Sequence, residues 1–391
     1  MSKTLSPPRD ITVPEPGSTT AREVLSQALR RALQELARLS KGSDPQQKAF
    51  APVFAQLLAR APGALIAVLR APTVGGLLRC LRRRELDATT LVTELLATLY
   101  TDLAVLAALP EPVTLTRLPP RILSLPARRT IEIPEGTQRA EFSNGQLRMF
   151  TGGEPIVVTL DRKHPDESAF VAIDDALALA LADNNPLAMF EAHPDKQGNA
   201  LALGGHPTSA WSESLGRALE LIGRHMPDLR REIELYLQLV VPVGYDEHKH
   251  LSASYQEIIG TVYMTLHPQL MTMVEATIHE FQHNKLHALL ELDPLLINAF
   301  SPLYTSPVRP DPRPLQGVLL AVHAFVPVAR LYQLMREAGD PISEHPEFER
   351  RYRQIVAGNH EGAQVLLEHA QPTPMGRTIL DEIRRWDAWS W

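Results

Sequence analysis

Residues 271–291 read MTMVEATIHEFQHNKLHALLE, and this stretch decides how the second half of the chain folds. No glycine or proline interrupts it, and apolar or weakly polar side chains recur at the spacing of one helical face. These side chains are Met273, Thr277, Ile278, Phe281, Leu286, Leu289 and Leu290. The pattern predicts one long helix with a buried face.

The same stretch contains an HExxH motif, formed by His279, Glu280 and His283. Positions i and i+4 lie on one face of a helix, so two imidazoles can bind the same metal ion. Glu280 lies about 100° further round the helix, near the metal without having to bind it. Such a short motif also occurs by chance on solvated helices, but this helix is apolar, and unpaired charge there is costly. The motif therefore predicts a metal site.

Composition narrows the class of protein. The chain has 391 residues, a net charge of −6 and 44% hydrophobic residues, which suffice for a buried core. It has no basic block, which argues against a nucleic-acid partner. The single cysteine, Cys80, excludes an internal disulfide and a zinc–thiolate site. The start does not resemble a signal peptide and no apolar run has membrane-spanning length, so we expect a cytoplasmic protein without membrane contact.

An α+β, mainly helical fold is predicted, in four parts. Residues 1–20 are polar and proline-rich, and we expect them to be disordered. Residues 21–110 show helical periodicity and form a helical domain, and the proline-rich residues 111–136 form a linker. Residues 137–391 form the HExxH catalytic domain, a zincin-like unit with a small sheet and the long metal helix.

Several shorter segments carry specific expectations. Asn144-Gly145 indicates a β-hairpin, and residues 261–266 indicate a strand. We expect that strand to be the sheet edge that holds an extended peptide. The prolines of residues 292–317 predict an ordered but mostly irregular loop. The basic run of Arg79 and residues 82–84 is interpreted as a solvated helix face rather than a docking surface for acidic peptides.

The third metal ligand decides the chemistry. His287 lies one further turn along the same helix, where binding the same ion would be strained. His323 is the best candidate, because it lies on a separate apolar helix; a core histidine bonded to the backbone is the alternative. Zinc at such a site would hydrolyse peptides with Glu280 as base, whereas iron(II) with vacant positions would accept a 2-oxo acid and dioxygen. Spacing alone does not choose between these metals.

Four runs together resemble one family: VPVGYDEHKHLSASYQEIIGTVYMTLHP, HEFQHNKLHALLELDP, SPLYTSPVRPDPRPLQGVLL and AVHAFVPVARLY. They are similar to the HExxH-type peptide-modification proteins of ribosomal peptide natural product pathways. The resemblance covers residues 186–371. It implies an Fe(II)- and 2-oxoglutarate-dependent dioxygenase that hydroxylates a β-carbon of a ribosomally made precursor peptide in the cytoplasm.

The resemblance also implies roles for individual residues. His279, His283 and His323 would bind iron, and Glu280 would orient a ligand, the substrate or a water. Arg309, or as second choice Arg313, would bind the distal carboxylate of 2-oxoglutarate, with Tyr304 as a hydroxyl donor. The alternative for the arginines is a structural tie to Asp311.

Two other functions stay open. One is a zinc metallopeptidase, acting on a leader peptide or more generally, with Glu280 as base. The other is a non-catalytic peptide-binding protein with a closed, four-ligand metal site. The N-terminal helices could bind a leader peptide or form a homodimer, and the sequence does not decide between these uses.

Overall fold

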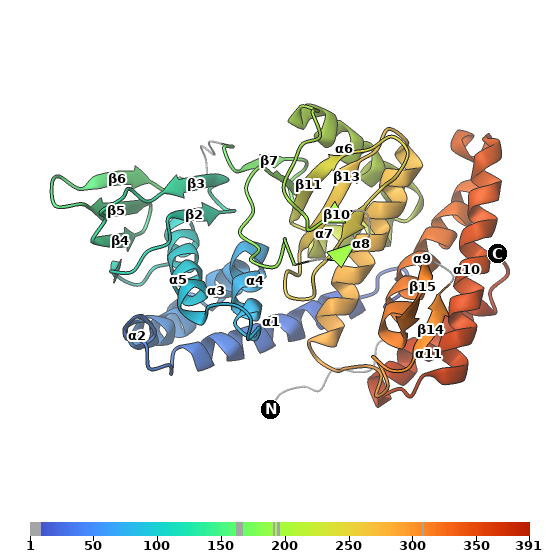
Figure 1. Cartoon of the computed structure of the whole chain (residues 1–391), viewed down its shortest axis with the longest axis horizontal. Coiled ribbons are helices and arrows are strands. Elements are labelled where there is room, and N and C mark those ends of the chain that lie inside the picture. The colour runs from blue at the N-terminus through green and yellow to red at the C-terminus, as the bar shows by residue number, and fades with distance from the viewer. Residues whose placement is uncertain (1–8, 162–166, 191, 194–195, 307–308) are drawn as a thin grey trace.

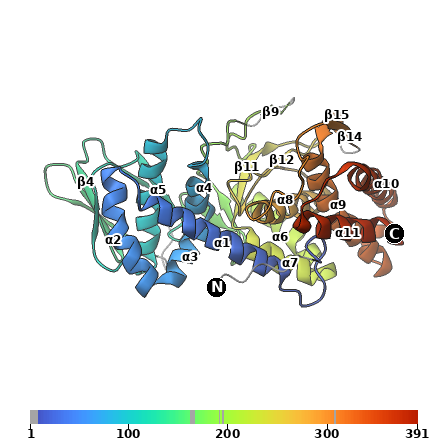
Figure 2. The same cartoon turned by 90° about the horizontal axis from the view of Figure 1, so that it is seen from below.

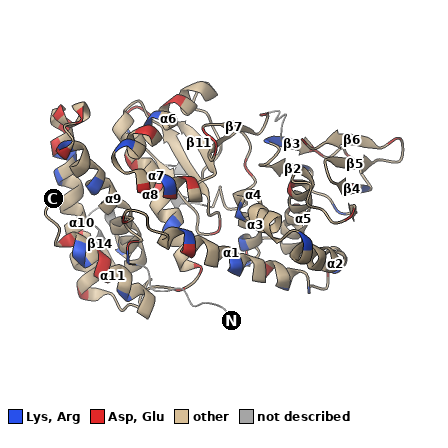
Figure 3. Cartoon of the chain, turned by 180° about the vertical axis from the view of Figure 1, so that it is seen from behind, with Lys and Arg blue, Asp and Glu red and all other residues tan. Residues whose placement is uncertain are grey.

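The computed structural model describes residues 9–161, 167–190, 192–193, 196–306 and 309–391. An α+β, mainly helical architecture is confirmed. A helical region and a small sheet lie at one end, a five-stranded sheet with the long helix α8 lies in the middle, and the C-terminal helices lie at the other end (Figure 1). Acidic and basic residues are interspersed along the ribbon (Figure 3).

Five helices form the N-terminal region, and local signals explain where they begin. Asp44 and Asp87 cap two of them by accepting backbone N–H groups, and proline occupies the first position of three. The helices are α1 (Thr20–Leu39), α2 (Pro45–Arg60), α3 (Pro62–Arg70), α4 (Pro72–Cys80) and α5 (Ala88–Val105). The prediction of helices throughout this region is confirmed.

The segment expected to be a linker, residues 111–136, contains three strands. The first of them pairs with the predicted Asn144-Gly145 hairpin, which is present with Gly145 at a φ of 77°. One sheet has the order β1-β4-β5-β6, and β2 pairs with β3. The bounds are β1 (Val113–Leu115), β2 (Arg121–Ser124), β3 (Arg129–Glu132), β4 (Arg139–Ser143), β5 (Gln146–Phe150) and β6 (Ile156–Thr159). The prolines here separate short strands instead of ending regular structure.

The central sheet has the order β12-β13-β11-β8-β7, with β13, β11 and β8 parallel. Its strands are β7 (Phe170–Ala172), β8 (Ala178–Ala180), β11 (Leu239–Tyr245), β12 (Ser252–Ala253) and β13 (Thr261–Leu266). The predicted strand at residues 261–266 is therefore present, but its expected edge position is wrong. The short antiparallel strand β12 covers it and forms the edge. A small β9 (Ala192–His193) and β10 (Lys196–Gln197) pair, and the helices α6 (Thr208–His225) and α7 (Pro227–Tyr236), complete this part.

The long predicted helix is α8 (Leu270–Leu290), which directly follows β13. The proline-rich segment after it forms a hairpin, β14 (Leu303–Ser306) and β15 (Arg309–Pro314), where an irregular loop was expected. A two-stranded ribbon tolerates proline because its outer N–H groups need no partner. The chain ends in α9 (Leu315–Glu337), the 3-10 turn η1 (Pro341–Glu344), α10 (Pro346–His369) and α11 (Pro374–Asp387).

The larger of two hydrophobic clusters joins the N-terminal helices to the rest, from Ile11 to Ile383, and the smaller one lies around the central sheet. The helix α1 runs from the helical region to α7 and α8, which it contacts (Figure 2). This larger cluster therefore includes residues from both sides of the segment 111–136.

The expected disorder of residues 1–20 is wrong for the described part, residues 9–20. The backbone N–H groups of Ile11 and Thr12 each donate to a carboxylate oxygen of Glu382 at 3.0 Å. Ile11 and Thr12 are fully buried. The polar, proline-rich composition predicted disorder, but the buried carboxylate of Glu382, far along the chain, accepts hydrogen bonds from this segment. Residues 1–8 lie outside the described part.

The basic run is a solvated face only in part, because Arg82, Arg83 and Arg84 are exposed as expected whereas Arg79 is buried. Arg79 is buried 4.0 Å from a carboxylate oxygen of Glu291, and Arg82 donates to both oxygens of the same carboxylate at 2.7 and 2.9 Å. Arg83 pairs with Glu85 and Glu257. Acidic residues far apart in sequence neutralise the run, and periodicity within one helix cannot reveal such partners.

The helix α9 is long and apolar enough to cross a membrane by length and composition. In this fold, 78% of its most apolar window is buried against the other elements. Its apolar character is thus accounted for by packing against α8 and α10.

The buried carboxyl group of Asp102 on α5 gives the first prediction. Burial raises the pKa of Asp102 from 3.8 to about 8, while Ser124 donates one hydrogen bond to it at 2.7 Å. The folded protein therefore retains a proton that the unfolded chain releases, and the free energy of unfolding falls as pH rises from about 4 to about 8. We expect Asp102→Asn to reduce that fall by on the order of 2 kcal/mol, measured by urea unfolding across this range.

Asp87, at the N-terminus of the same helix, provides the control. Its hydrogen bonds from Thr90 lower its pKa, so its contribution to stability is lost only as the solution becomes acidic. Asp87→Asn should leave the pH dependence between pH 5 and 8 unchanged. Equal slopes for Asp102→Asn and the wild type would contradict a buried, protonated Asp102.

Candidate metal centre

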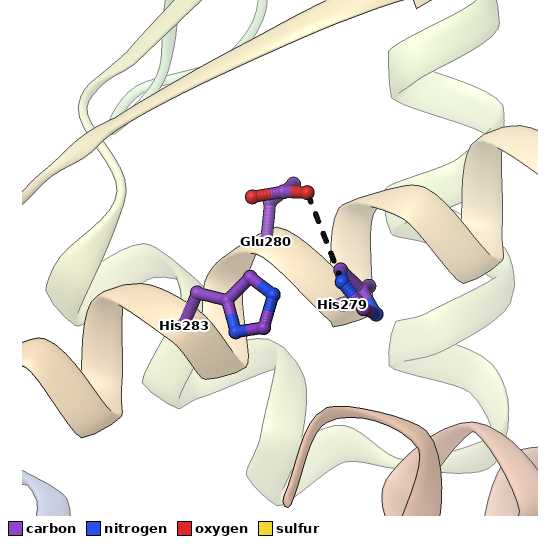
Figure 4. Close-up of side chains that lie close together, drawn as sticks. All are labelled: His279, Glu280 and His283. Atoms are coloured by element: carbon purple, nitrogen blue, oxygen red, sulfur yellow. Dashed lines mark ion pairs between the residues drawn. The ribbon is translucent and has the colours of Figure 1, made fainter. Parts of the chain in front are cut away.

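The helix α8 brings the three residues of the HExxH motif together. Ligand atoms of His279, Glu280 and His283 all lie within 4.8 Å of one another (Figure 4). The rings of His279 and His283 are 4.3 Å apart at 79°, as expected for i and i+4 side chains that point toward the same space. No fourth His, Cys, Asp or Glu of the described residues belongs to this group.

The carboxylate of Glu280 is buried and accepts a hydrogen bond from Ser254. It is buried, with 2% of its surface exposed. Its Oε2 accepts a hydrogen bond from Ser254 Oγ at 2.6 Å, while its Oε1 lies 4.0 Å from Nε2 of His279. The carboxylate is therefore in place to bind a metal between the histidines, or to act as a base next to it.

Burial favours the neutral form of His283, which is the form that binds metals. Desolvation holds the pKa of His283 well below its ordinary value, and the neighbouring rings of His279, His287 and His323 lower it further. Nδ1 of His283 is buried without a hydrogen-bond partner among the described residues. A buried, unpartnered imidazole nitrogen is costly unless something binds the ring, so this observation fits a metal site.

His323, the predicted third ligand, does not join this group. It is fully buried, and its Nδ1 lies 3.1 Å from Oγ1 of Thr12. Its carbonyl oxygen accepts from Nε2 of Gln282 at 3.1 Å. Two positions along α9, Phe325 packs on His279 with ring centroids 4.7 Å apart. Residues two apart on a helix point about 200° away from each other, so α9 directs Phe325 to the motif and His323 into the core.

A cavity of about 690 Å³ lies in front of the two histidines. The residues that α9 contributes to the lining are apolar, whereas most of those that α10 contributes are polar. The lining residues are His279, His283, Arg313, Gly317, Leu320, Ala321, Phe325, Arg351, Gln354, Ile355, Ala357, Gly358, Asn359 and Glu361. The cavity is large enough for a small acid together with part of a peptide.

The predicted arginines and tyrosine have different positions. Arg313 on β15 lines the cavity. The side chain of Arg309 lies outside the described part of the structure. Tyr304 is the register partner of Arg313, but its ring stacks on His369 at 4.8 Å, and it does not line the cavity. Of the two arginines carried over from the resemblance, Arg313 is therefore the one shown to lie at the cavity.

Sequence reasoning missed Ser254 and the α10 wall. Arg351 lines the cavity but pairs with Glu275 at 2.6 Å, and Tyr332 donates to the same carboxylate at 2.6 Å. Gln354, Gly358 and Glu361 are spaced to share a helix face, which is the one signal that could have indicated this wall. No sequence pattern connects Ser254 to Glu280, because the loop that holds it is irregular.

Metal binding gives the second prediction. We expect the protein to bind one divalent ion, and His279→Ala or His283→Ala to weaken binding by more than about 100-fold, because each removes a ligand. His323→Asn should retain the wild-type affinity, because that side chain faces Thr12. Isothermal titration of the apo-protein with Zn²⁺ or Co²⁺ measures this.

The exposed His248 provides the surface control, and His248→Ala should bind metal as the wild type does. A loss of binding in His323→Asn, with unfolding temperature unchanged, would contradict this arrangement and return His323 to the ligand set.

Comparison with known proteins adds no family assignment: a scan against protein-family models and a search of curated proteins each produced no match.

Proposed function

We propose that this chain is an Fe(II)- and 2-oxoglutarate-dependent dioxygenase that hydroxylates a β-carbon in a ribosomally synthesised precursor peptide. One observation carries the proposal. One cavity is lined by His279, His283 and Arg313 together. A metal-binding pair and a carboxylate-binding cation in one cavity are what a chelating 2-oxo diacid requires.

The proposed iron ligands are His279, His283 and Glu280. Two imidazoles and one carboxylate are the ligand set typical of non-haem iron(II) oxygenases, and they leave positions open for other molecules. Glu280 is the carboxylate grouped with both histidines, and it takes the role that was predicted for His323. A closed, structural site would need a fourth protein ligand, which the described residues do not add to this group.

Arg313 is the proposed partner of the distal carboxylate of 2-oxoglutarate. A planar guanidinium binds a carboxylate with two parallel hydrogen bonds. The other arginine of the cavity, Arg351, already has Glu275 as partner, so its charge is offset. Arg313 lines the same cavity and is one of the two arginines that the resemblance assigns to this role.

Bound iron with 2-oxoglutarate and dioxygen would supply the oxidising chemistry, and the chain's residues would supply binding and position. Phe325 and Leu320 form an apolar wall beside His279, and that wall excludes water from the reacting centre. Gly317 and Ala321 are small, and they leave room for a substrate side chain. The polar wall of α10 offers hydrogen-bonding groups to the peptide backbone.

The zincin-like plan of the domain is part of the proposal. A mixed sheet precedes the helix α8, and its edge next to that helix is the antiparallel strand β12. An extended peptide could add to this edge by backbone hydrogen bonds, which suits a precursor peptide as partner.

A zinc metallopeptidase is the second candidate, and one contact favours it. The short hydrogen bond from Ser254 keeps Glu280 as an acceptor beside His279, which also suits a general base. The two candidates differ in what the cavity must hold, because a peptidase has no use for a 2-oxo acid.

Visible absorption under anaerobic conditions gives the third prediction. Adding Fe(II) and then 2-oxoglutarate to the apo-protein should produce a metal-to-ligand charge-transfer band, and His279→Ala should abolish it. Arg313→Ala should raise the 2-oxoglutarate concentration needed for half of the band by about 10- to 100-fold, because the two hydrogen bonds of a guanidinium to the carboxylate are lost. Arg351→Ala is the matched control from the same cavity and should change this concentration far less.

If the band is absent, and the protein binds zinc tightly and cleaves unstructured peptides, the oxygenase proposal is wrong and the protein is a zinc peptidase. If Arg351→Ala weakens the band and Arg313→Ala does not, the protein is still an oxygenase, but α10 provides the residue that binds the distal carboxylate.

A further inference from the structure

A second pair of residues on α8 repeats the i, i+4 spacing of the histidines. Glu280 and Asn284 follow His279 and His283 by one residue each, so the two pairs lie side by side along the helix. The histidines line the cavity. Glu280 and Asn284 instead contact the loop between β12 and β13, which contains Ser254.

Asn284 is fully buried and its orientation is fixed. Its Oδ1 accepts from the backbone N–H of Gly260 at 2.7 Å, which identifies the other amide atom as the nitrogen. That Nδ2 lies 2.9 Å from the carbonyl oxygen of Glu280 and 3.2 Å from that of Thr261. It also lies 3.2 Å from Oγ of Ser254. Asn284 thus joins the metal helix to this loop.

The contacts of Ser254 determine the direction of its proton. The amide nitrogen of Asn284 can only donate, so the hydroxyl oxygen accepts there and its own proton goes elsewhere. Two oxygens of Glu280 are within reach of that proton: the backbone carbonyl oxygen at 3.4 Å and Oε2 at 2.6 Å. The shorter distance is typical of a hydroxyl that donates to a charged carboxylate, so the proton goes to Oε2. Ser254 therefore donates its hydrogen bond to Oε2, and Oε1 is the oxygen on the side of His279.

We infer that Ser254, held by Asn284, is a positioning residue that turns Oε1 of Glu280 toward the metal bound by His279 and His283. The inference rests on the proposed metal site. It holds whether Glu280 contacts the ion or acts as a base beside it. The hydroxyl is supplied by the residue directly after the edge strand β12, so the loop next to the proposed peptide edge also orients the carboxylate.

Cobalt(II) binding to the apo-protein tests this inference without any turnover. We expect Ser254→Ala to raise the dissociation constant about 10-fold or more, the usual effect of losing a group that orients a metal ligand. Its visible Co(II) absorption should also change in shape, because the carboxylate is free to rotate. Ser254→Thr keeps the hydroxyl and should restore both properties.

Ser252→Ala, on β12 itself, is the matched control and should behave as the wild type. Thermal unfolding of each apo-variant separates positioning from folding, since Asn284 keeps three other contacts when Ser254 is lost. Wild-type affinity and absorption in Ser254→Ala would overturn the inference and leave the metal site standing. An effect that matches a loss of apo-stability, and that threonine does not rescue, would also overturn it. No cobalt binding by the wild type would overturn the metal site and the inference together.

Discussion

The polar surface of the buried helix α8 is the constraint on which the rest of the fold depends. Lys285 is fully buried and bonds to Glu232 on α7 at 2.7 Å, with its ammonium also 5.1 Å from the ring of Phe281. Removing one partner of such a pair costs about 3–5 kcal/mol, because the other charge stays buried. Gln282 and Asn284 likewise need partners, and they find them in the N-terminal segment and in the loop before β13. The helix α7, the N-terminal segment and the loop before β13 therefore each bond to a polar side chain of α8.

This arrangement explains why α8 can present two histidines to a cavity and still lie in the core. One face of the helix is open to the cavity, whereas the others are closed by α1, α6, α7 and α9. A rigid, fully supported helix holds ligand side chains more precisely than a loop does. Phe325 does not have to support α8, so its side chain can instead shape the cavity in front of His279.

The sequence predicted those features that depend on neighbours in the chain. Helix α8 follows from its uninterrupted periodicity, the turn at Asn144-Gly145 from its residue types, and the pairing of His279 with His283 from their spacing. It did not predict contacts between distant segments. The burial of Ile11, which depends on Glu382, is one example. The position of His323 is another, because periodicity marks a residue as buried without saying which way the helix turns it.

The proline-rich hairpin shows a different limit. Proline counts against strands in general, yet β14 and β15 form an isolated ribbon in which few N–H groups need partners. The edge strand β12 has two residues, too few for any periodicity to show. Both features lie beside the candidate site, where irregular segments are expected to concentrate.

The contact between Thr12 and Glu382 spans 370 positions of the chain, and this has a consequence for synthesis. Thr12 also accepts from Gln282 and lies against His323, so it completes the packing behind the HExxH helix. During translation this packing cannot close until residue 382 has left the ribosome. The nascent polypeptide therefore carries its HExxH segment through most of synthesis without that support, and a chaperone or an early metal ion would meet it in an open form.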